Sequence, residues 1–141
     1  MWPWFLVGLA ALYAGAAASR RAKRRIAERA WRNALPARFE DELASMGYAR
    51  AEAHLLAPQL AEVTVRELMS GFNVRDFSGL IHALAKTGGG RQAEIEMRLI
   101  NALVRKLPRS IDRGLAQSGV SRALRAAGSD AMRAARQSSH V

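Results

Sequence analysis

The sequence predicts an all-α protein with a single N-terminal transmembrane helix, a small cytoplasmic bundle of three or four helices, and a basic helical C-terminal tail. Three observations predict this class. The chain opens with an uncharged apolar run, later apolar side chains recur every three or four residues, and no segment alternates with period two. We expect four parts: an anchor over 1–19, a basic juxtamembrane helix over 20–35, the bundle over 36–107, and a basic amphipathic, partly flexible tail over 108–141.

The expected anchor runs from Trp2 to Ser19 and contains no charged residue. A helix of this length spans roughly 27 Å, close to the roughly 30 Å of a bilayer's hydrocarbon core. Its second half consists almost entirely of small residues, so insertion should be marginal. A cleaved signal peptide and a buried core helix are the alternatives; the first normally has its positive charge before the apolar run, and the second normally has a polar face. The side chains expected to hold the anchor are Trp2, Trp4, Phe5, Leu6, Leu9 and Leu12.

A cluster of basic residues follows the apolar run directly. Because lysine and arginine stay on the cytoplasmic side of a membrane, the N-terminus should lie outside and the C-terminus in the cytoplasm, most simply at a bacterial inner membrane. Contact with anionic headgroups explains the cluster without nucleic acid. The residues expected to make that contact are Arg20, Arg21, Lys23, Arg24 and Arg25.

Small residues recur within the anchor at spacings of three and four. Gly8, Ala11, Gly15 and Ala18 would share one face of a helix and let a second transmembrane helix approach closely. This face is a candidate helix-helix seam. The alternative is that an alanine-rich segment shows such a stripe by chance.

Charge is distributed in three blocks. Residues 20–38 hold eight basic side chains and one acidic, residues 39–104 hold six and nine, and residues 105–141 hold eight and two, which gives +7, −3 and +6 and sums to the net charge of +10. Such a basic chain attracts phosphate, on lipid or nucleic acid. The absence of cysteine excludes disulfides, zinc-thiolate sites and thiol catalysis.

The middle block is expected to form short helices. We expect helices over 36–46, from about 49 to 71 with an interruption near Pro58, from 74 with Asn73 as its cap to just before Gly88, and over about 91–107. The last of these has a narrow polar wedge of Arg91, Glu94, Arg98, Asn101 and Arg105. The core is small, so membrane or partner contacts should supply part of its stability.

Beyond Pro108, a thin apolar line of residues runs among arginines, and glycines at 114, 119 and 128 should interrupt any helix. Such a segment could bind an anionic bilayer, nucleic-acid phosphates or a protein partner. The alternative is a solvated helix that closes the bundle. No aromatic residue follows Phe77, which excludes base stacking from the tail. The basic residues of the tail are Arg109, Arg113, Arg122, Arg125, Arg133 and Arg136.

No motif indicates catalysis, a cofactor or a metal. The three glycines at 88–90 are followed by Arg91 and Gln92, whereas a phosphate-binding loop needs lysine and then serine or threonine. His54 and His82 lack a second ligand at three or four residues. Glu67 and Asp76 have a spacing loosely like that of the carboxylates in phage lysozyme-type glycosidases, but the accompanying glycine-rich hairpin and threonine are missing. We expect no enzyme and no cofactor.

These features favour a non-catalytic single-pass membrane protein that acts as an accessory, assembly or scaffold subunit of a membrane-associated complex. Its partners would be an anionic bilayer and a protein, either another chain or a second copy. A membrane-tethered, nonspecific nucleic-acid-binding protein for conjugation, phage assembly or chromosome attachment is one alternative. A membrane-disrupting phage or toxin protein is the other.

Overall fold

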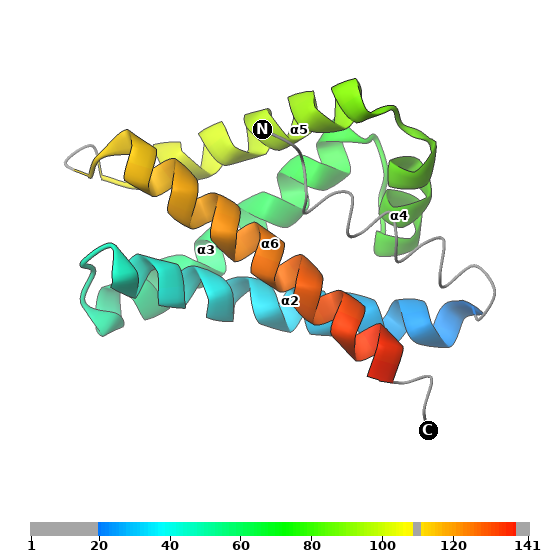
Figure 1. The fold of residues 1–141 in the computed structure, drawn as a ribbon, viewed down its shortest axis with the longest axis horizontal. Coiled ribbons are helices and arrows are strands. Elements are labelled where there is room, and N and C mark those ends of the chain that lie inside the picture. Colours follow the sequence, from blue (N-terminus) through cyan, green and yellow to red (C-terminus); the bar gives the residue numbers. More distant parts are fainter. Residues whose placement is uncertain (1–19, 109–110, 138–141) are drawn as a thin grey trace.

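A computed structural model describes residues 20–108 and 111–137. In these ranges the chain forms helices α2 (Arg20–Ser45), α3 (Arg50–Gly71), α4 (Phe77–Lys86), α5 (Gly89–Arg105) and α6 (Arg113–Gln137) (Figure 1). This part of the chain holds no strand, and the all-α class is confirmed. None of its helices combines the length and the apolarity that crossing a bilayer requires. The expected anchor and the candidate seam lie wholly within residues 1–19, outside the described residues.

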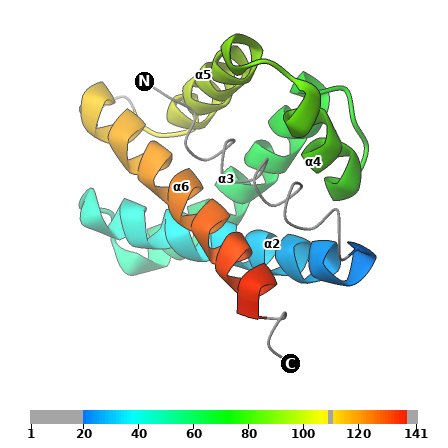
Figure 2. The same cartoon turned by 45° about the vertical axis from the view of Figure 1, so that its right-hand side comes forward.

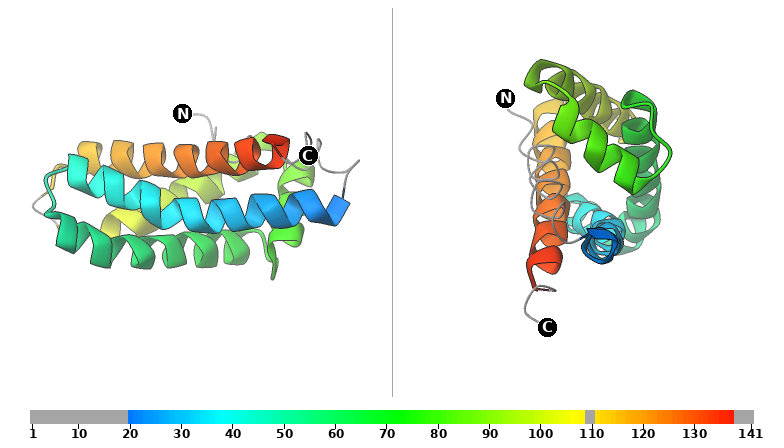
Figure 3. Two further views of the ribbon diagram at one scale, coloured as in Figure 1. Left: turned by 90° about the horizontal axis from the view of Figure 1, so that it is seen from below. Right: turned by 90° about the vertical axis from the view of Figure 1, so that its right-hand side faces the viewer.

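The antiparallel pair of α2 and α6 is the most extensive helix contact of the bundle (Figures 1 and 3). The buried residues of α2 lie four apart and, except for Ala27, are large, whereas most of those on α6 are small. Because small side chains form most of the buried face of α6, that helix can pack closely against α2. The α2 line is Ala27, Trp31, Leu35, Phe39 and Leu43, and the α6 face includes Ala116, Gly119, Val120, Ala123, Leu124, Ala127 and Ala131.

The remaining helices complete the bundle around this pair. α3 packs on α2, and α5 contacts both α3 and α6 (Figure 2). The short α4 meets α2 through Phe77, whose ring centroid lies 5.6 Å from that of Trp31 with the planes tilted by 48°. Gln92, buried at the start of α5, donates from Nε2 to the carbonyl oxygens of Leu84 and Thr87 at 2.6 and 2.9 Å. These two hydrogen bonds tie the end of α4 and the loop after it to the start of α5.

Two helices continue through prolines at which the sequence predicts a boundary. Pro36 lies inside α2 and Pro58 inside α3. An interior proline removes one helical hydrogen bond and costs about 3 kcal/mol. Because the buried line of α2 extends on both sides of Pro36, through Trp31 and Phe39, tertiary burial offsets that cost. The segment expected as a separate juxtamembrane helix therefore belongs to the core.

The other boundaries differ less from expectation. α4 begins at Phe77 with Asp76 as its N-cap, whose Oδ1 accepts a 2.7 Å hydrogen bond from the Gly79 N–H. Asn73, the expected cap, instead has a φ of +54° in the turn before it. α5 covers nearly the expected range, and its polar wedge is exposed as predicted.

Residues 113–137, within the expected tail, form one continuous helix. The expected interruptions at Gly119 and Gly128 are not present, because both glycines are buried within α6. A Cβ at Gly119 would overlap the terminal methyl of Met46 on the segment following α2, so the missing side chain leaves room for the end of the Met46 side chain. Of the apolar line beyond Pro108, Val120 and Leu124 are buried, Ile111 and Met132 pack partly buried against the core, and Leu115 is exposed. Residues 113–137 therefore match the alternative expectation, a helix that closes the bundle.

Candidate anionic-ligand interface on α2 and α6

Antiparallel packing joins the two basic blocks of the sequence. Arg38 pairs with Asp130, and Glu42 pairs with Arg122, so residue numbers rise along α2 as they fall along α6. The end of α6 consequently lies beside the basic first half of α2 (Figure 1). We call this region the basic end of the bundle.

A row of hydrogen-bond donors on α2 dominates the basic end. Arg25, Arg29 and Asn33 recur every four residues and are exposed, which places them on one face of the helix. We call these three residues the α2 ladder. Within the described residues, neither guanidinium makes an ion pair, and no hydrogen bond is formed by the Asn33 amide. Among the residues that the structure describes, the ladder thus presents donors to which no acceptor is bonded.

Two shallow depressions lie on either side of the α2 ladder. One, of about 320 Å³, is lined by the ladder together with Ile26, Ala30 and, from α6, Ala134. The other, of about 330 Å³, is lined by the ladder together with Glu28 and Arg32. In that second depression Arg32 Nε donates to Glu28 Oε2 at 3.1 Å, so these two charges neutralise each other. Of these two depressions, the first combines the two arginines of the ladder with apolar side chains.

The basic residues predicted to contact lipid lie partly within this region. Lys23 and Arg24 are half-buried and Arg25 is exposed. Arg20 and Arg21 are the first two residues of α2, and their side chains are not among those that the structure describes. Of this predicted set, Arg25 is the residue that joins the ladder.

The arginines of the expected tail do not form one surface. Arg122 pairs with Glu42 at 3.1 Å, and Arg133 pairs with Asp130 at 3.5 Å. Arg125 contacts the Ser121 carbonyl oxygen at 3.5 Å. Only the arginines of the last turns reach the basic end. Arg113 and Arg136 are exposed, and Arg109 lies outside the described residues.

A buried carboxyl group, Glu96 on α5, was not anticipated. Its side chain lies on the inward face of the helix and is 6% exposed. Burial raises the pKa of Glu96 to about 7, and this effect outweighs the opposing influence of Arg125 across the α5–α6 contact. The signal in the sequence is its spacing, since position 96 falls four residues from both Gln92 and Ile100 on the buried side of α5.

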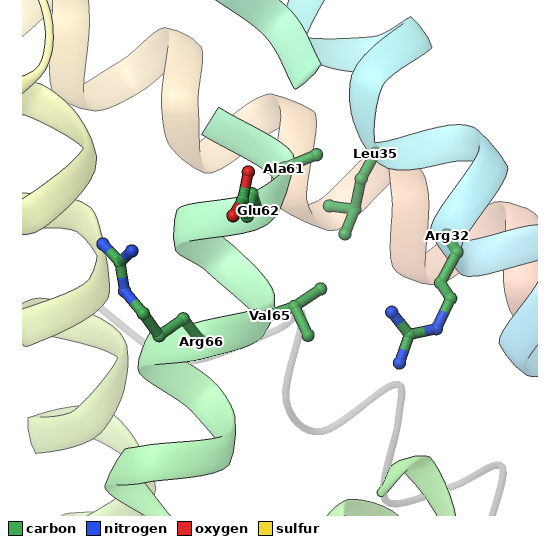
Figure 4. A pocket seen from close by; sticks show the side chains of 6 residues that line it. All are labelled: Arg32, Leu35, Ala61, Glu62, Val65 and Arg66. Atoms are coloured by element: carbon green, nitrogen blue, oxygen red, sulfur yellow. The ribbon is translucent and has the colours of Figure 1, made fainter. Parts of the chain in front are cut away.

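The groove between α2 and α3 has a different character. It measures about 360 Å³, and the side chains of Leu35, Ala61 and Val65 converge in it, whereas Arg66 points away from them (Figure 4). Because polar groups do not converge there, the groove lacks the features that orient a ligand.

Two other groups singled out by the sequence, His54 and Asp76, have structural partners. His54 Nδ1 lies 2.8 Å from Glu40 Oε1 on the surface, and Asp76 caps α4. In residues 20–108 and 111–137, no three histidine or carboxylate side chains lie close enough together to hold a metal ion. Comparison of the chain with protein-family models, with curated proteins and with solved structures gave no match. Function must therefore be argued from the site itself.

Proposed function

We propose that the protein is a non-catalytic single-pass membrane protein whose bundle lies at the cytoplasmic face as an accessory, assembly or scaffold subunit. One observation carries the proposal: the basic end of the bundle is also the end at which the apolar segment joins it. α2 begins at the residue that directly follows Ser19, and the α2 ladder and Arg136 lie along the same end. A bundle attached there places its excess positive charge beside anionic headgroups. Each cation near the surface then contributes about 1 kcal/mol to the free energy of membrane binding.

The opposite end of the bundle supports the partner-binding part of the proposal. Leu55 near the start of α3 is 71% exposed, and Leu115 near the start of α6 is 52% exposed. Both helices begin at the end of the bundle farthest from the first turn of α2 (Figure 1). These side chains offer apolar contact to a protein partner at the end of the bundle farthest from the start of α2.

Membrane integration is tested by expressing the full chain and washing membranes with alkaline carbonate. We expect the chain to stay in the membrane fraction, and a Leu9→Arg variant to be released, because a charge at the centre of a marginal apolar segment opposes insertion. A fluorescent reporter at the C-terminus should be active in the cytoplasm. Recovery of the unchanged chain in the soluble fraction would overturn the proposal.

The accessory role is tested by gentle detergent extraction followed by native electrophoresis. We expect a complex of defined stoichiometry that Leu55→Asp/Leu115→Asp dissociates while leaving membrane integration intact. A matched variant, Ser70→Asp/Asn101→Asp, changes exposed polar residues elsewhere and should leave the complex unchanged. Migration of the wild-type chain as a monomer would contradict a scaffold role.

The second candidate is a membrane-tethered, nonspecific nucleic-acid-binding protein. The basic end favours it as well, because arginine is attracted to the phosphates of nucleic acids and of lipids alike. The described residues expose no fully accessible aromatic ring for stacking on bases: Trp31, Phe39 and Phe77 are buried, and Tyr48 and Phe72 are half-buried. Binding of the full chain to short duplex or single-stranded DNA, with affinity falling steeply as salt rises, would favour this candidate. Absence of binding at low salt would end it.

A further inference from the structure

We propose that the α2 ladder and the apolar depression beside it bind the phosphate headgroup of an anionic phospholipid, with α2 lying along the bilayer surface. This inference rests on the proposed function, because it names the lipid that the basic end would contact. It adds Arg29, Asn33 and the α6 residue Ala134 to the contact expected from the sequence.

The ladder has the chemistry of a phosphate site. Two guanidinium groups one helical turn apart offer forked donors that match phosphate oxygens, and the Asn33 amide adds a neutral donor one turn further on. Within the described residues, no carboxylate is bonded to Arg25 or Arg29. The nearest acid on the same helix, Glu28, is paired with Arg32 at 3.1 Å. The two guanidinium groups therefore remain available to an external anion.

The apolar floor favours a lipid over other phosphates. Ile26 is 39% exposed between the two arginines, and Ala30 and Ala134 continue the apolar surface toward α6. A phospholipid carries glycerol and acyl carbons directly beside its phosphate, so it satisfies both the cations and the floor. A nucleic-acid phosphate satisfies only the cations, and leaves Ile26 against water.

The length of α2 determines how the helix must lie. At about 1.5 Å per residue, Arg29 and Asn33 lie roughly 14 and 20 Å along the axis from Arg20. The headgroup region on each side of a bilayer is only about 5–8 Å thick. A perpendicular α2 would bring Arg25 alone into that region. All three donors reach it only if α2 runs close to parallel with the surface.

Lipid selectivity is measured on the full chain in mild detergent by native mass spectrometry, with phosphatidylglycerol and phosphatidylcholine as the two probes. We expect preferential binding of phosphatidylglycerol, and about a thirtyfold loss in the Arg25→Gln/Arg29→Gln variant, from about fivefold per cation. The control Arg98→Gln/Arg105→Gln removes the same charge from exposed positions on α5 and should keep most of the affinity. Equal losses in both variants would indicate general charge attraction and overturn the site.

The orientation of α2 is measured separately. Ala37 is exposed and continues the ladder by one turn, and the chain has no cysteine, so single cysteines can carry a spin label. In vesicles containing phosphatidylglycerol, a label at Ala37→Cys should report the headgroup region, and a label at Asn101→Cys on α5 should report bulk water. If the labels at positions 37 and 101 are equally accessible to water-soluble relaxants, the parallel orientation is overturned.

Failure of this inference is distinguishable from failure of the proposed function. A chain that carbonate washing releases from membranes contradicts the proposed function itself. A chain that stays in the membrane but binds phosphatidylglycerol equally well with and without the two arginines contradicts only the lipid site. Displacement of phosphatidylglycerol by short duplex DNA, dependent on the same arginines, would assign the ladder to nucleic acid and overturn the lipid site.

Discussion

The guanidinium group of Arg38 on α2 donates two hydrogen bonds to the carboxylate of Asp130 on α6, from Nε to Oδ2 and from Nη2 to Oδ1, each 2.8 Å long. One turn further along α2, Glu42 accepts from Arg122 of α6. These two contacts show that the two helices run antiparallel. The hydrogen bonds from Arg38 lower the pKa of Asp130 below its ordinary value.

Removing this pair should lower the free energy of unfolding modestly. We expect Asp130→Asn to cost about 1 kcal/mol, because the bonds are charge-assisted but solvent screens the Arg38 side chain, which is 40% exposed. Since the folded-state pKa of Asp130 is lowered, the contribution is present above the ordinary carboxyl pKa and is lost as pH falls through the folded value. Urea unfolding of Asp130→Asn, Arg38→Gln and the double variant measures the coupling. The exposed pair of Glu28 and Arg32 serves as the control and should show only a few tenths of a kcal/mol.

The buried Glu96 should make stability depend on pH in the opposite sense. Because its pKa is raised to about 7, the folded chain retains a proton that the unfolded chain loses near pH 4.5. Its contribution is therefore full below pH 4.5, and falls as pH rises through 7 by up to about 3 kcal/mol. Unfolding at pH 5 and pH 8 should show this loss in the wild type and not in Glu96→Gln. The control variant Glu94→Gln changes an exposed carboxylate on the same helix and should keep the loss of stability between pH 5 and pH 8. If Glu96→Gln shows the same pH dependence as the wild type, the pH dependence does not arise from Glu96.

Replacing glycine by alanine should change the stability of the fold differently at two positions. A Cβ at Gly71 would lie 2.9 Å from Cγ2 of Ile95, a branched side chain fixed in the core, so Gly71→Ala should lower stability by about 1–3 kcal/mol. At Gly119 the obstacle is the end of the flexible Met46 side chain, which can swing away. Gly119→Ala should therefore be close to neutral, since alanine also favours the helix by up to about 1 kcal/mol. Thermal unfolding of both variants tests this order, and a reversed order would contradict it.

Truncation of Trp31 should be the most destabilising of these changes. Its side chain is fully buried on α2 and packs on Phe77, so Trp31→Ala should cost about 3–5 kcal/mol. Leu55→Ala removes an exposed apolar side chain and should change the free energy of unfolding by less than about 0.5 kcal/mol. Far-UV circular dichroism during urea titration measures both. Similar effects at the two positions would contradict the placement of the core.

The predictions that hold are those that depend on local pattern. In the segment expected to form a helix before Gly88, the apolar side chains at helical spacing form the buried face of α4, namely Phe77, Leu80, Ile81 and Leu84. The polar wedge of α5 is likewise exposed. Both follow from side chains recurring at helical spacing, which needs no knowledge of neighbouring segments.

The predictions that failed involve residues whose local preference is overridden. Pro36 and Pro58 indicate helix boundaries, and Gly119 and Gly128 indicate interruptions, yet all four lie within continuous helices. At Pro36 the buried line of α2 offsets the lost hydrogen bond. At Gly119 the absence of a side chain permits the approach of Met46. The sequence alone does not reveal these compensating contacts, because they join distant segments.

The sequence by itself determined the all-α class, the apolar run before Arg20 and the two basic blocks that flank an acidic centre. Only the tertiary structure decided that the basic blocks meet. The antiparallel pairing of α2 with the small-residue face of α6 brings the last turns of α6 beside Arg25 and Arg29. Charge along a chain is a local property, but a surface site depends on which helix faces pack together, and long-range burial determines that choice.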